Sequence, residues 1–263
     1  MTDDGGSGWD GAAYDQVNGL QRWVADRTLA ELVVAGDERA LDVGCGDGRI
    51  TAELARRLPR GSVLGIDPSP GMLEVARGRI TADTPHLGFA EGAVETLDLH
   101  EEFDLVVSFN ALHWVSDHPE AFARMSRALV VGGRAVLQLV CEGERPSVED
   151  VASAVAAGPA YSSRLSGATA PYHHPVEAVF LDEARAEGFT VVDSRVDDLA
   201  WDFGTPAGLR EWLRVGFSAW LLRLPDDVTR VAFVDDVATS YAAVVDSVTV
   251  VRFLQLRVEL HRP

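Results

Sequence analysis

The sequence contains no lysine, and this absence sets the first limits on function. Its 23 basic residues, all arginines, face 41 acidic ones, so the formal net charge is −18. A surface of this sign repels phosphate backbones and anionic lipids, and we therefore expect no nucleic-acid partner and no membrane partner. The phosphate loop of nucleoside triphosphatases needs a lysine after its last glycine, so that kind of site is excluded as well.

Cysteine is scarce too, since only Cys45 and Cys141 occur. Two cysteines do not form a disulfide framework, so we expect a reducing, cytoplasmic location. No Cys/His spacing is typical of zinc, and we predict no metal site. Residues 1–12 lack the basic and apolar regions of a signal peptide, and we expect them to be disordered. No apolar run approaches membrane-spanning length.

One stretch organises the rest of the chain. A short apolar run leads into a turn with three glycines at alternate positions: Leu41-Asp42-Val43-Gly44-Cys45-Gly46-Asp47-Gly48-Arg49. Apolar residues at helical spacing follow at once, so the turn connects a buried strand to a helix. Glycine accepts positive φ and has no Cβ, which lets a ligand contact bare backbone. The helix start adds free N–H groups and a positive dipole end, and the pattern predicts a site for a nucleotide-like cofactor.

The identity of that cofactor depends on detail within the turn. The dinucleotide fingerprint needs a glycine at position 49, where Arg49 stands. An NAD-dependent oxidoreductase stays an alternative, although no Tyr-x-x-x-Lys pair is apparent. The pattern that remains is D-x-G-x-G-x-G with Asp42 at the strand end, and an acidic residue there suits a ligand that carries an ammonium group. The non-functional alternative is a glycine-rich loop that binds no ligand.

Strands and helices alternate over the first half of the chain. Apolar runs predict strands at 40–43, 62–67, 87–91, 103–108 and 134–140, with helical patterns between them and before them, at 14–34. We expect Ser69 to cap the helix after the second strand, with Pro70 as its first residue, and a turn at Gly132-Gly133 before the last strand. This order indicates an α/β fold with a parallel sheet and helices on both faces. Asp67 ends the second of these strands, where a carboxylate can accept hydrogen bonds from both hydroxyl groups of a ribose.

The second half of the chain predicts a cap on that core. We assign residues 13–141 to a cofactor-binding core, completed by 177–204 and 246–263, and 142–176 and 205–245 to helical insertions over the C-terminal edge of the sheet. The insertions carry Trp212, Phe217 and Trp220. We expect these rings to wall an apolar acceptor pocket, and the alternative is that they pack the core of the cap itself.

Three stretches carry a resemblance to a known family: Tyr14–Arg22 (YDQVNGLQR), Ala40–Thr51 (ALDVGCGDGRIT) and Phe103–Val115 (FDLVVSFNALHWV). The chain resembles class I S-adenosyl-L-methionine (SAM) dependent methyltransferases, in particular the group around trans-aconitate methyltransferase and juvenile hormone acid methyltransferase. The resemblance implies a Rossmann-like, seven-stranded, mostly parallel sheet with an antiparallel last strand. It also implies an N-terminal helix that folds over the cofactor.

The activity implied is transfer of a methyl group from SAM to a small-molecule acceptor in secondary metabolism, with a carboxylate oxygen as the favoured acceptor atom. Methylation of a hydroxyl, an amine or a carbon stays open, as does a SAM-binding protein without transfer activity. We expect a monomer or a homodimer.

The resemblance also implies the site residues. It places cofactor contacts at Tyr14, Asp42, Gly44, Cys45, Gly46, Asp67, Pro68, Met72, Ala93, Val94 and Asn110. Ala93 stands where many such enzymes have an aspartate that grips the adenine amino group, so backbone groups would serve instead, and Asn110 would bond the methionine end of SAM. Gln21, His113 and Trp114 are the predicted catalytic residues, and the amide and the indole N–H are neutral donors that can orient a carboxylate.

Overall fold

A single sheet forms the centre of the computed structural model, which describes residues 19–165 and 172–263. The sheet has seven strands in the order β3-β2-β1-β4-β5-β7-β6. β7 runs antiparallel to both of its neighbours, and the other pairs are parallel. The strands are β1 (Arg39–Val43), β2 (Ser62–Asp67), β3 (Leu87–Glu91), β4 (Phe103–Phe109), β5 (Leu129–Val140), β6 (Thr190–Asp202) and β7 (Val250–His261). The predicted Rossmann-like fold, with its antiparallel last strand, is confirmed.

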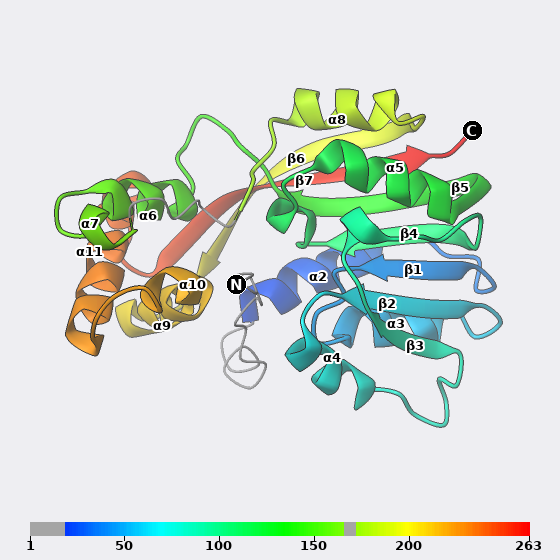
Figure 1. The fold of residues 1–263 in the computed structure, drawn as a ribbon, viewed down its shortest axis with the longest axis horizontal. Coiled ribbons are helices and arrows are strands. Elements are labelled where there is room, and N and C mark those ends of the chain that lie inside the picture. Colours follow the sequence, from blue (N-terminus) through cyan, green and yellow to red (C-terminus); the bar gives the residue numbers. More distant parts are fainter. Residues whose placement is uncertain (1–18, 166–171) are drawn as a thin grey trace, which may run out of the picture.

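Helices cover both faces of this sheet (Figure 1). On one face, Phe122 of α5 (His118–Ala128) and Phe180 of α8 (Glu177–Ala186) join a core cluster with the strands. On the other, Leu29 of α2 (Gly19–Glu31) and Leu54 of α3 (Arg49–Arg57) do the same. Next to the strand ends lie α4 (Pro70–Arg77) and the short helices η1 (Val94–Thr96) and η2 (Leu112–Trp114). Two apolar clusters, one on each face of the sheet, therefore hold the strands in place.

A second group of helices packs at one end of the molecule (Figure 1). We call them the distal helices: α6 (Val148–Ala157), α7 (Ser162–Leu165), α9 (Pro206–Gly216), α10 (Ser218–Leu221) and α11 (Asp227–Val245). Their buried residues, among them Phe233 and Tyr241, form a further core cluster, which also includes Leu20 and Val24 of α2 and, from the outer part of β7, Phe253. The long strands β6 and β7 thus connect the two cores.

Most predicted boundaries agree with the structure, and local chemistry explains why. Ser69 caps α4 by accepting a hydrogen bond from the Met72 N–H, and Pro70 occupies the first helical turn, as predicted. The turn expected at Gly132 and Gly133 is wrong, because these residues lie within β5 as a bulge with φ of 82° at Gly132. Tyr14, the expected disorder of 1–12 and the helical pattern before residue 19 lie outside the described residues.

Candidate active site

The glycine turn after β1 has the backbone that the sequence predicts. Gly44, Gly46 and Gly48 have φ of 72°, 54° and 74°, a region that other residues rarely adopt. The Gly44 N–H donates to the Ile66 carbonyl at 2.8 Å. A Cβ on Gly44 would lie 2.2 Å from the Cβ of Ala111, whereas a Cβ on Gly46 would meet no atom of the described residues within 4 Å. Gly44 is therefore required by close packing, and Gly46 faces open space that a ligand can fill.

Asp67 stands beside that open space at the end of β2. Its side chain accepts hydrogen bonds from the Gly46 N–H at 2.9 Å and from the Ser69 N–H at 2.8 Å, one on each oxygen. Burial raises the pKa of Asp67 above its usual value, while these two hydrogen bonds oppose the rise. Because a carboxylate oxygen has room for more than one hydrogen bond, both oxygens can still accept from a ligand hydroxyl.

Asp42, the predicted acidic residue of the turn, is enclosed instead. It is only 2% exposed, and it accepts a hydrogen bond from the Thr51 hydroxyl at 2.7 Å. Burial raises the pKa of Asp42 to about 7, and the bond from Thr51 opposes the rise. Asp42 therefore holds the start of α3 against the turn.

The ends of the neighbouring strands complete the edge. The Gly92 N–H donates to the Asp67 carbonyl at 3.2 Å, which brings Ala93 next to Asp67. On the other side of β1, Asn110 follows β4 with φ of 59°, and its N–H donates to the Gln138 carbonyl at 2.7 Å. Of the remaining predicted contacts, Pro68 is exposed, and three are largely buried: Cys45, Met72 and Val94. The parallel strand order β3-β2-β1-β4 thus brings the predicted cofactor residues to one edge.

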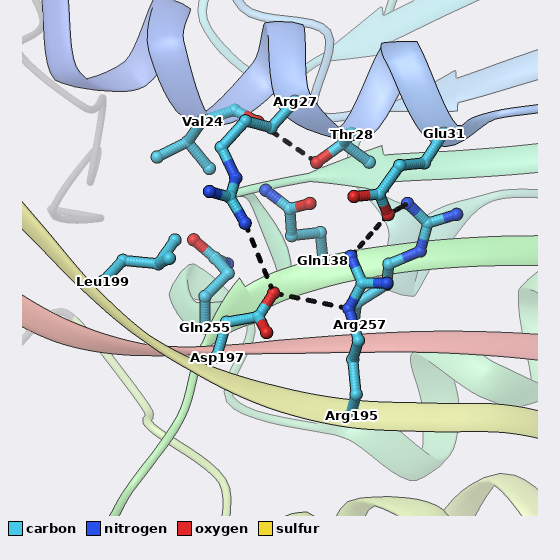
Figure 2. Close-up of a pocket in the computed structure, with 10 residues that line it drawn as sticks. All are labelled: Val24, Arg27, Thr28, Glu31, Gln138, Arg195, Asp197, Leu199, Gln255 and Arg257. Carbon is cyan, nitrogen blue, oxygen red and sulfur yellow. Dashed lines mark hydrogen bonds and ion pairs between the residues drawn. The ribbon is translucent and has the colours of Figure 1, made fainter.

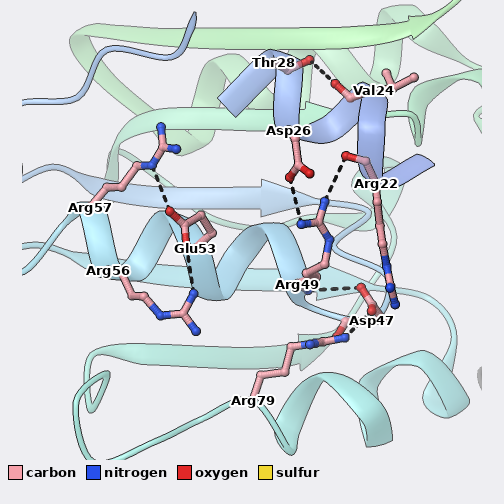
Figure 3. Close-up of polar contacts among 10 residues, drawn as sticks. All are labelled: Arg22, Val24, Asp26, Thr28, Asp47, Arg49, Glu53, Arg56, Arg57 and Arg79. Atoms are coloured by element: carbon pink, nitrogen blue, oxygen red, sulfur yellow. Dashed lines mark hydrogen bonds and ion pairs between the residues drawn. The ribbon is translucent and has the colours of Figure 1, made fainter. Parts of the chain in front are cut away.

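Arg49, which stands where the dinucleotide fingerprint has a glycine, ties helix α2 to this edge of the sheet. The guanidinium of Arg49 donates to the Asp26 carboxylate at 2.9 Å and to the Arg22 carbonyl at 3.2 Å, and both partners lie on α2 (Figure 3). On the other side of the turn, Arg79 pairs with Asp47. Sequence reasoning used Arg49 only to exclude a ligand class and missed this link. The link places α2 alongside the turn, as expected of a helix that covers the cofactor.

Gln21 and Trp114 sit on different elements of the site. Gln21 is on α2, and its Oε1 atom is enclosed without a hydrogen-bond partner in the part of the chain that the structure describes. Trp114 is on η2 and is 38% exposed. Its indole ring lies 6.1 Å from the ring of Tyr172, edge to face. Trp114 therefore borders the segment that leads into α8.

His113 is a neutral side chain at neutral pH. Burial, together with the nearby His174 and His118, lowers the pKa of His113 to about 3. Its ring centre lies 6.0 Å from that of His174, and its carbonyl accepts a hydrogen bond from the His173 N–H at 2.6 Å. A histidine with so low a pKa is a weak base. His113 is thus suited to shaping the site and to hydrogen bonding rather than to removing a proton.

An open cavity of about 360 Å³ adjoins these rings. Its lining comprises Glu142, Gly143, Glu144, Pro146, Asp150, Ser153, Tyr172 and His174. Phe217 and Trp220, which the sequence suggested as pocket walls, are 5% and 4% exposed and lie in the core of the distal helices. The cavity wall is therefore acidic, and no sequence motif had indicated this.

Three further findings concern metal-binding groups, cysteines and membrane-spanning helices. Among the described residues, no group of three or more His, Cys, Asp or Glu is arranged to hold a metal ion. Cys45 and Cys141 are both free and buried. Within residues 19–165 and 172–263, no helix combines the length and the apolar character needed to cross a membrane.

Comparison with known proteins agrees with this geometry. Residues 40–133, which contain the turn, Asp67 and Asn110, match the family model described as "Methyltransferase domain". Fold and family model together support a class I SAM-dependent methyltransferase, and the family match itself is confined to residues 40–133. SAM is the cofactor of that class, and the open space at Gly46 beside the Asp67 carboxylate fits its ribose end.

The curated relatives add a more particular name. Trans-aconitate 2-methyltransferase of Methylobacterium nodulans is 33% identical over 162 residues, which cover 62% of this chain and 61% of that protein. The enzyme of the same name from Deinococcus radiodurans is 36% identical over 128 residues, covering 49% of this chain and 45% of that protein. The matched part of the chain thus spans about half to three fifths of the length of these relatives.

Solved structures show the same fold over nearly the whole chain. YcgJ from Bacillus subtilis superposes with a TM-score of 0.62 over 92% of this chain and 98% of that chain, at 15% identity. Phosphoethanolamine N-methyltransferase 2 from Haemonchus contortus, solved with S-adenosylhomocysteine, has a TM-score of 0.62 over 96% of this chain and 57% of that one, at 18% identity. The [4+2]-cyclase SpnF reaches 0.60 over 93% and 80%, at 21% identity. At these identities the likeness shows the fold alone.

Proposed function

We propose that this protein transfers a methyl group from SAM to a small-molecule acceptor. The observation that carries the proposal is the glycine turn, in which the bare backbone of Gly46 faces open space between Asp67 and the loop of Asn110. When bound, SAM would supply an electrophilic methyl group. Asp67 would accept hydrogen bonds from its ribose hydroxyls, backbone groups of Ala93 and Val94 would meet the adenine, and Asn110 would contact the methionine end.

The chain's own contribution is mainly to position the reactants and exclude water. Helix α2, fixed to the turn through Arg49, would cover the cofactor on one side. Trp114 and the neutral ring of His113 would shape the space in which the acceptor meets the methyl group. The very low pKa of His113 argues against base catalysis by this residue, so we favour an acceptor that needs no deprotonation at neutral pH.

A carboxylate oxygen meets that condition, and we propose it as the acceptor atom, on a small acid of secondary metabolism. Gln21 and Trp114 would orient the carboxylate through neutral donors, which hold it without forming an ion pair that lowers its reactivity. The name trans-aconitate 2-methyltransferase, carried by the curated relatives, supports this choice.

A second candidate is a neutral hydroxyl or an amine, and the acidic cavity favours it. Glu142, Glu144 and Asp150 line this cavity beside Tyr172 and His174. Carboxylates so placed repel an anion and attract a cation, and the acceptor would reach Trp114 past them. We further propose a cytoplasmic location, because both cysteines are free, and a monomer or a homodimer without nucleic acid.

One assay separates these possibilities. Purified protein is incubated with methyl-labelled SAM and a panel of small acids, together with their matching alcohols and amines. We expect S-adenosylhomocysteine and a labelled methyl ester that base hydrolyses. Gln21→Ala and Trp114→Ala should lower turnover at least tenfold, while calorimetric affinity for S-adenosylhomocysteine stays within about twofold. A base-stable methyl product would transfer the assignment to the second candidate, and tight binding of SAM without product from any acceptor would support a binding protein.

A further inference from the structure

Two buried glutamines occupy the sheet face beneath α2. Gln138 on β5 and Gln255 on β7 are 4% and 3% exposed, and both line a small hollow of about 10 Å³ (Figure 2). Among the described residues, the Nε2 of Gln138 and the Oε1 of Gln255 have no hydrogen-bond partner. Nearly all buried polar atoms in proteins do have one, and an unpaired atom is destabilising. As packing alone, an apolar side chain would serve better at these positions, so the amides call for another explanation.

The Nε2 end of the Gln255 amide provides that explanation. Its Nε2 donates a hydrogen bond to the Oδ1 of Asn110 at 3.1 Å. Asn110 is already held through its backbone, because its N–H donates to the carbonyl of Gln138 at 2.7 Å. Two neighbouring strands, β5 and β7, therefore fix both the backbone and the side chain of a residue whose φ is positive.

The surroundings of Gln255 set which end of its amide faces Asn110. The hollow that Gln255 lines is bordered by the guanidinium groups of Arg27, Arg195 and Arg257, which pair with the carboxylates of Glu31 and Asp197 (Figure 2). Three positive charges against two negative ones leave this side of the amide net positive, which favours the carbonyl oxygen of Gln255 toward the hollow and its Nε2 toward Asn110.

This orientation decides what Asn110 can offer a ligand. Since its Oδ1 accepts from Gln255, the Nδ2 donor is left for other partners, and the side chain makes no further hydrogen bond within the described chain. Asn110 precedes Ala111, whose Cβ packs against Gly44. The donor group therefore belongs to the loop that contacts the glycine turn.

We propose that Gln255 is a positioning residue that holds the Asn110 amide so that its Nδ2 donates to the α-carboxylate of SAM. The proposal rests on the proposed function, since it takes SAM as the ligand. It adds a residue more than 140 positions away in sequence, on a strand outside the matched methyltransferase segment 40–133. In this arrangement the outer, antiparallel strand contributes to recognition of the amino-acid end of the cofactor.

The test compares two ligands that differ only in that end. S-adenosylhomocysteine carries the amino-acid group, whereas 5′-methylthioadenosine lacks it. In Gln255→Met, which keeps the volume and loses the amide, we expect the Kd of S-adenosylhomocysteine to rise about tenfold and that of methylthioadenosine to stay within twofold. In Gln255→Glu, an ionised carboxylate would attract the Nδ2 of Asn110 and turn Oδ1 toward the ligand carboxylate. The rise for S-adenosylhomocysteine should then be larger, about 30-fold or more.

Two further variants complete the design. Gln138→Met changes the other glutamine of the hollow, which does not touch the Asn110 side chain, and it should leave both affinities unchanged. In an Asn110→Ala background, Gln255→Met should cause no additional loss, because the residue through which it acts is gone. Thermal denaturation shows that each variant is folded, and the Asn110→Ala comparison still decides the matter if Gln255→Glu does not fold.

The outcomes are distinct. Equal loss of affinity for both ligands in Gln255→Met, or an undiminished effect in the Asn110→Ala background, would mean a merely structural role and would overturn the inference. If the unaltered protein binds neither S-adenosylhomocysteine nor SAM, the proposed function itself fails. If the unaltered protein binds them and the ligand difference is absent, only the role of Gln255 fails.

Discussion

The two sides of the candidate active site are built in different ways. The cofactor side is mostly backbone: a turn with three positive-φ glycines, Asp67 bound to two N–H groups, and strand ends brought together by a parallel sheet. The acceptor side is mostly side chains from separate segments, namely Trp114, Tyr172, His174 and the carboxylates of the cavity. A site built from backbone groups can be predicted from one short stretch of sequence. A site built from side chains draws on distant segments, and each of its residues can be replaced separately.

The largest effect that we expect is a loss of stability caused by a substitution in the distal helices, and it tests whether the two sides are independent. Phe217 is 5% exposed in their core, so Phe217→Ala should lower the free energy of unfolding by about 3–5 kcal/mol. Because no residue of the glycine turn belongs to that core, affinity for S-adenosylhomocysteine should stay within about twofold in the folded variant. Urea denaturation and calorimetry measure the two quantities, and Phe217→Leu provides a milder variant if the alanine form is poorly folded. A large loss of cofactor affinity in the folded variant would break the comparison.

The next effect concerns the buried carboxyl of the cofactor side. Burial raises the pKa of Asp42 to about 7, well above the ordinary value of an aspartate, so the native state binds this proton more tightly than the unfolded chain. Its contribution to stability is therefore full at pH below about 4 and is lost as the pH rises to about 7. Asp42→Asn removes this dependence, and its free energy of unfolding relative to the unaltered protein should rise by about 2–4 kcal/mol between pH 4 and 8.

A second variant controls that measurement. The hydroxyl of Thr51 donates to Asp42 and opposes the rise in its pKa, so Thr51→Val should steepen the loss of stability with pH. Denaturation with urea at a series of pH values gives both slopes. A pH-independent difference between Asp42→Asn and the unaltered protein would show that this carboxyl is not what titrates.

The smallest effect tests the claim that Gly46 faces a ligand. Gly46 and Gly132 both have positive φ, and a Cβ on either would meet nothing within 4 Å in residues 19–165 and 172–263. Alanine at either position should therefore destabilise the fold by a similar amount, about 1–2 kcal/mol. Only Gly46→Ala should weaken S-adenosylhomocysteine, about tenfold, because its methyl group enters the space proposed for the ligand. Similar affinities in the two variants would remove Gly46 from the binding surface.

The sequence was most informative where local rules act alone. The turn from Gly44 to Gly48, the cap at Ser69 and the strand that ends at Asp67 each follow from residues adjacent in the chain, and the structure has them as predicted. Gly132 shows where such rules fail: a turn was expected there, but β5 continues through it, and its N–H donates to the carbonyl of Arg262 just beyond β7. Local preference could not report that distant partner.

The candidate site shows the same division. Residues placed by strand ends were predicted, whereas the Arg49 link to α2, the acidic cavity and Gln255 were not, because each depends on contacts between distant segments. One signal was available: Gln138 and Gln255 each stand between two leucines in otherwise apolar strands. A polar amide in such a run is unusual enough to mark a buried contact, although it does not name the partner.

The paired strands β6 and β7 have a mechanical consequence. Their ladder runs from Thr190 opposite His261 to Asp202 opposite Val250, whereas β5 accompanies β7 only as far as Gln255. Beyond that point the distal helices are borne by a two-stranded ribbon (Figure 1). Such a ribbon resists stretching and sliding but twists readily. We therefore expect the distal helices to twist relative to the sheet more easily than they separate from it.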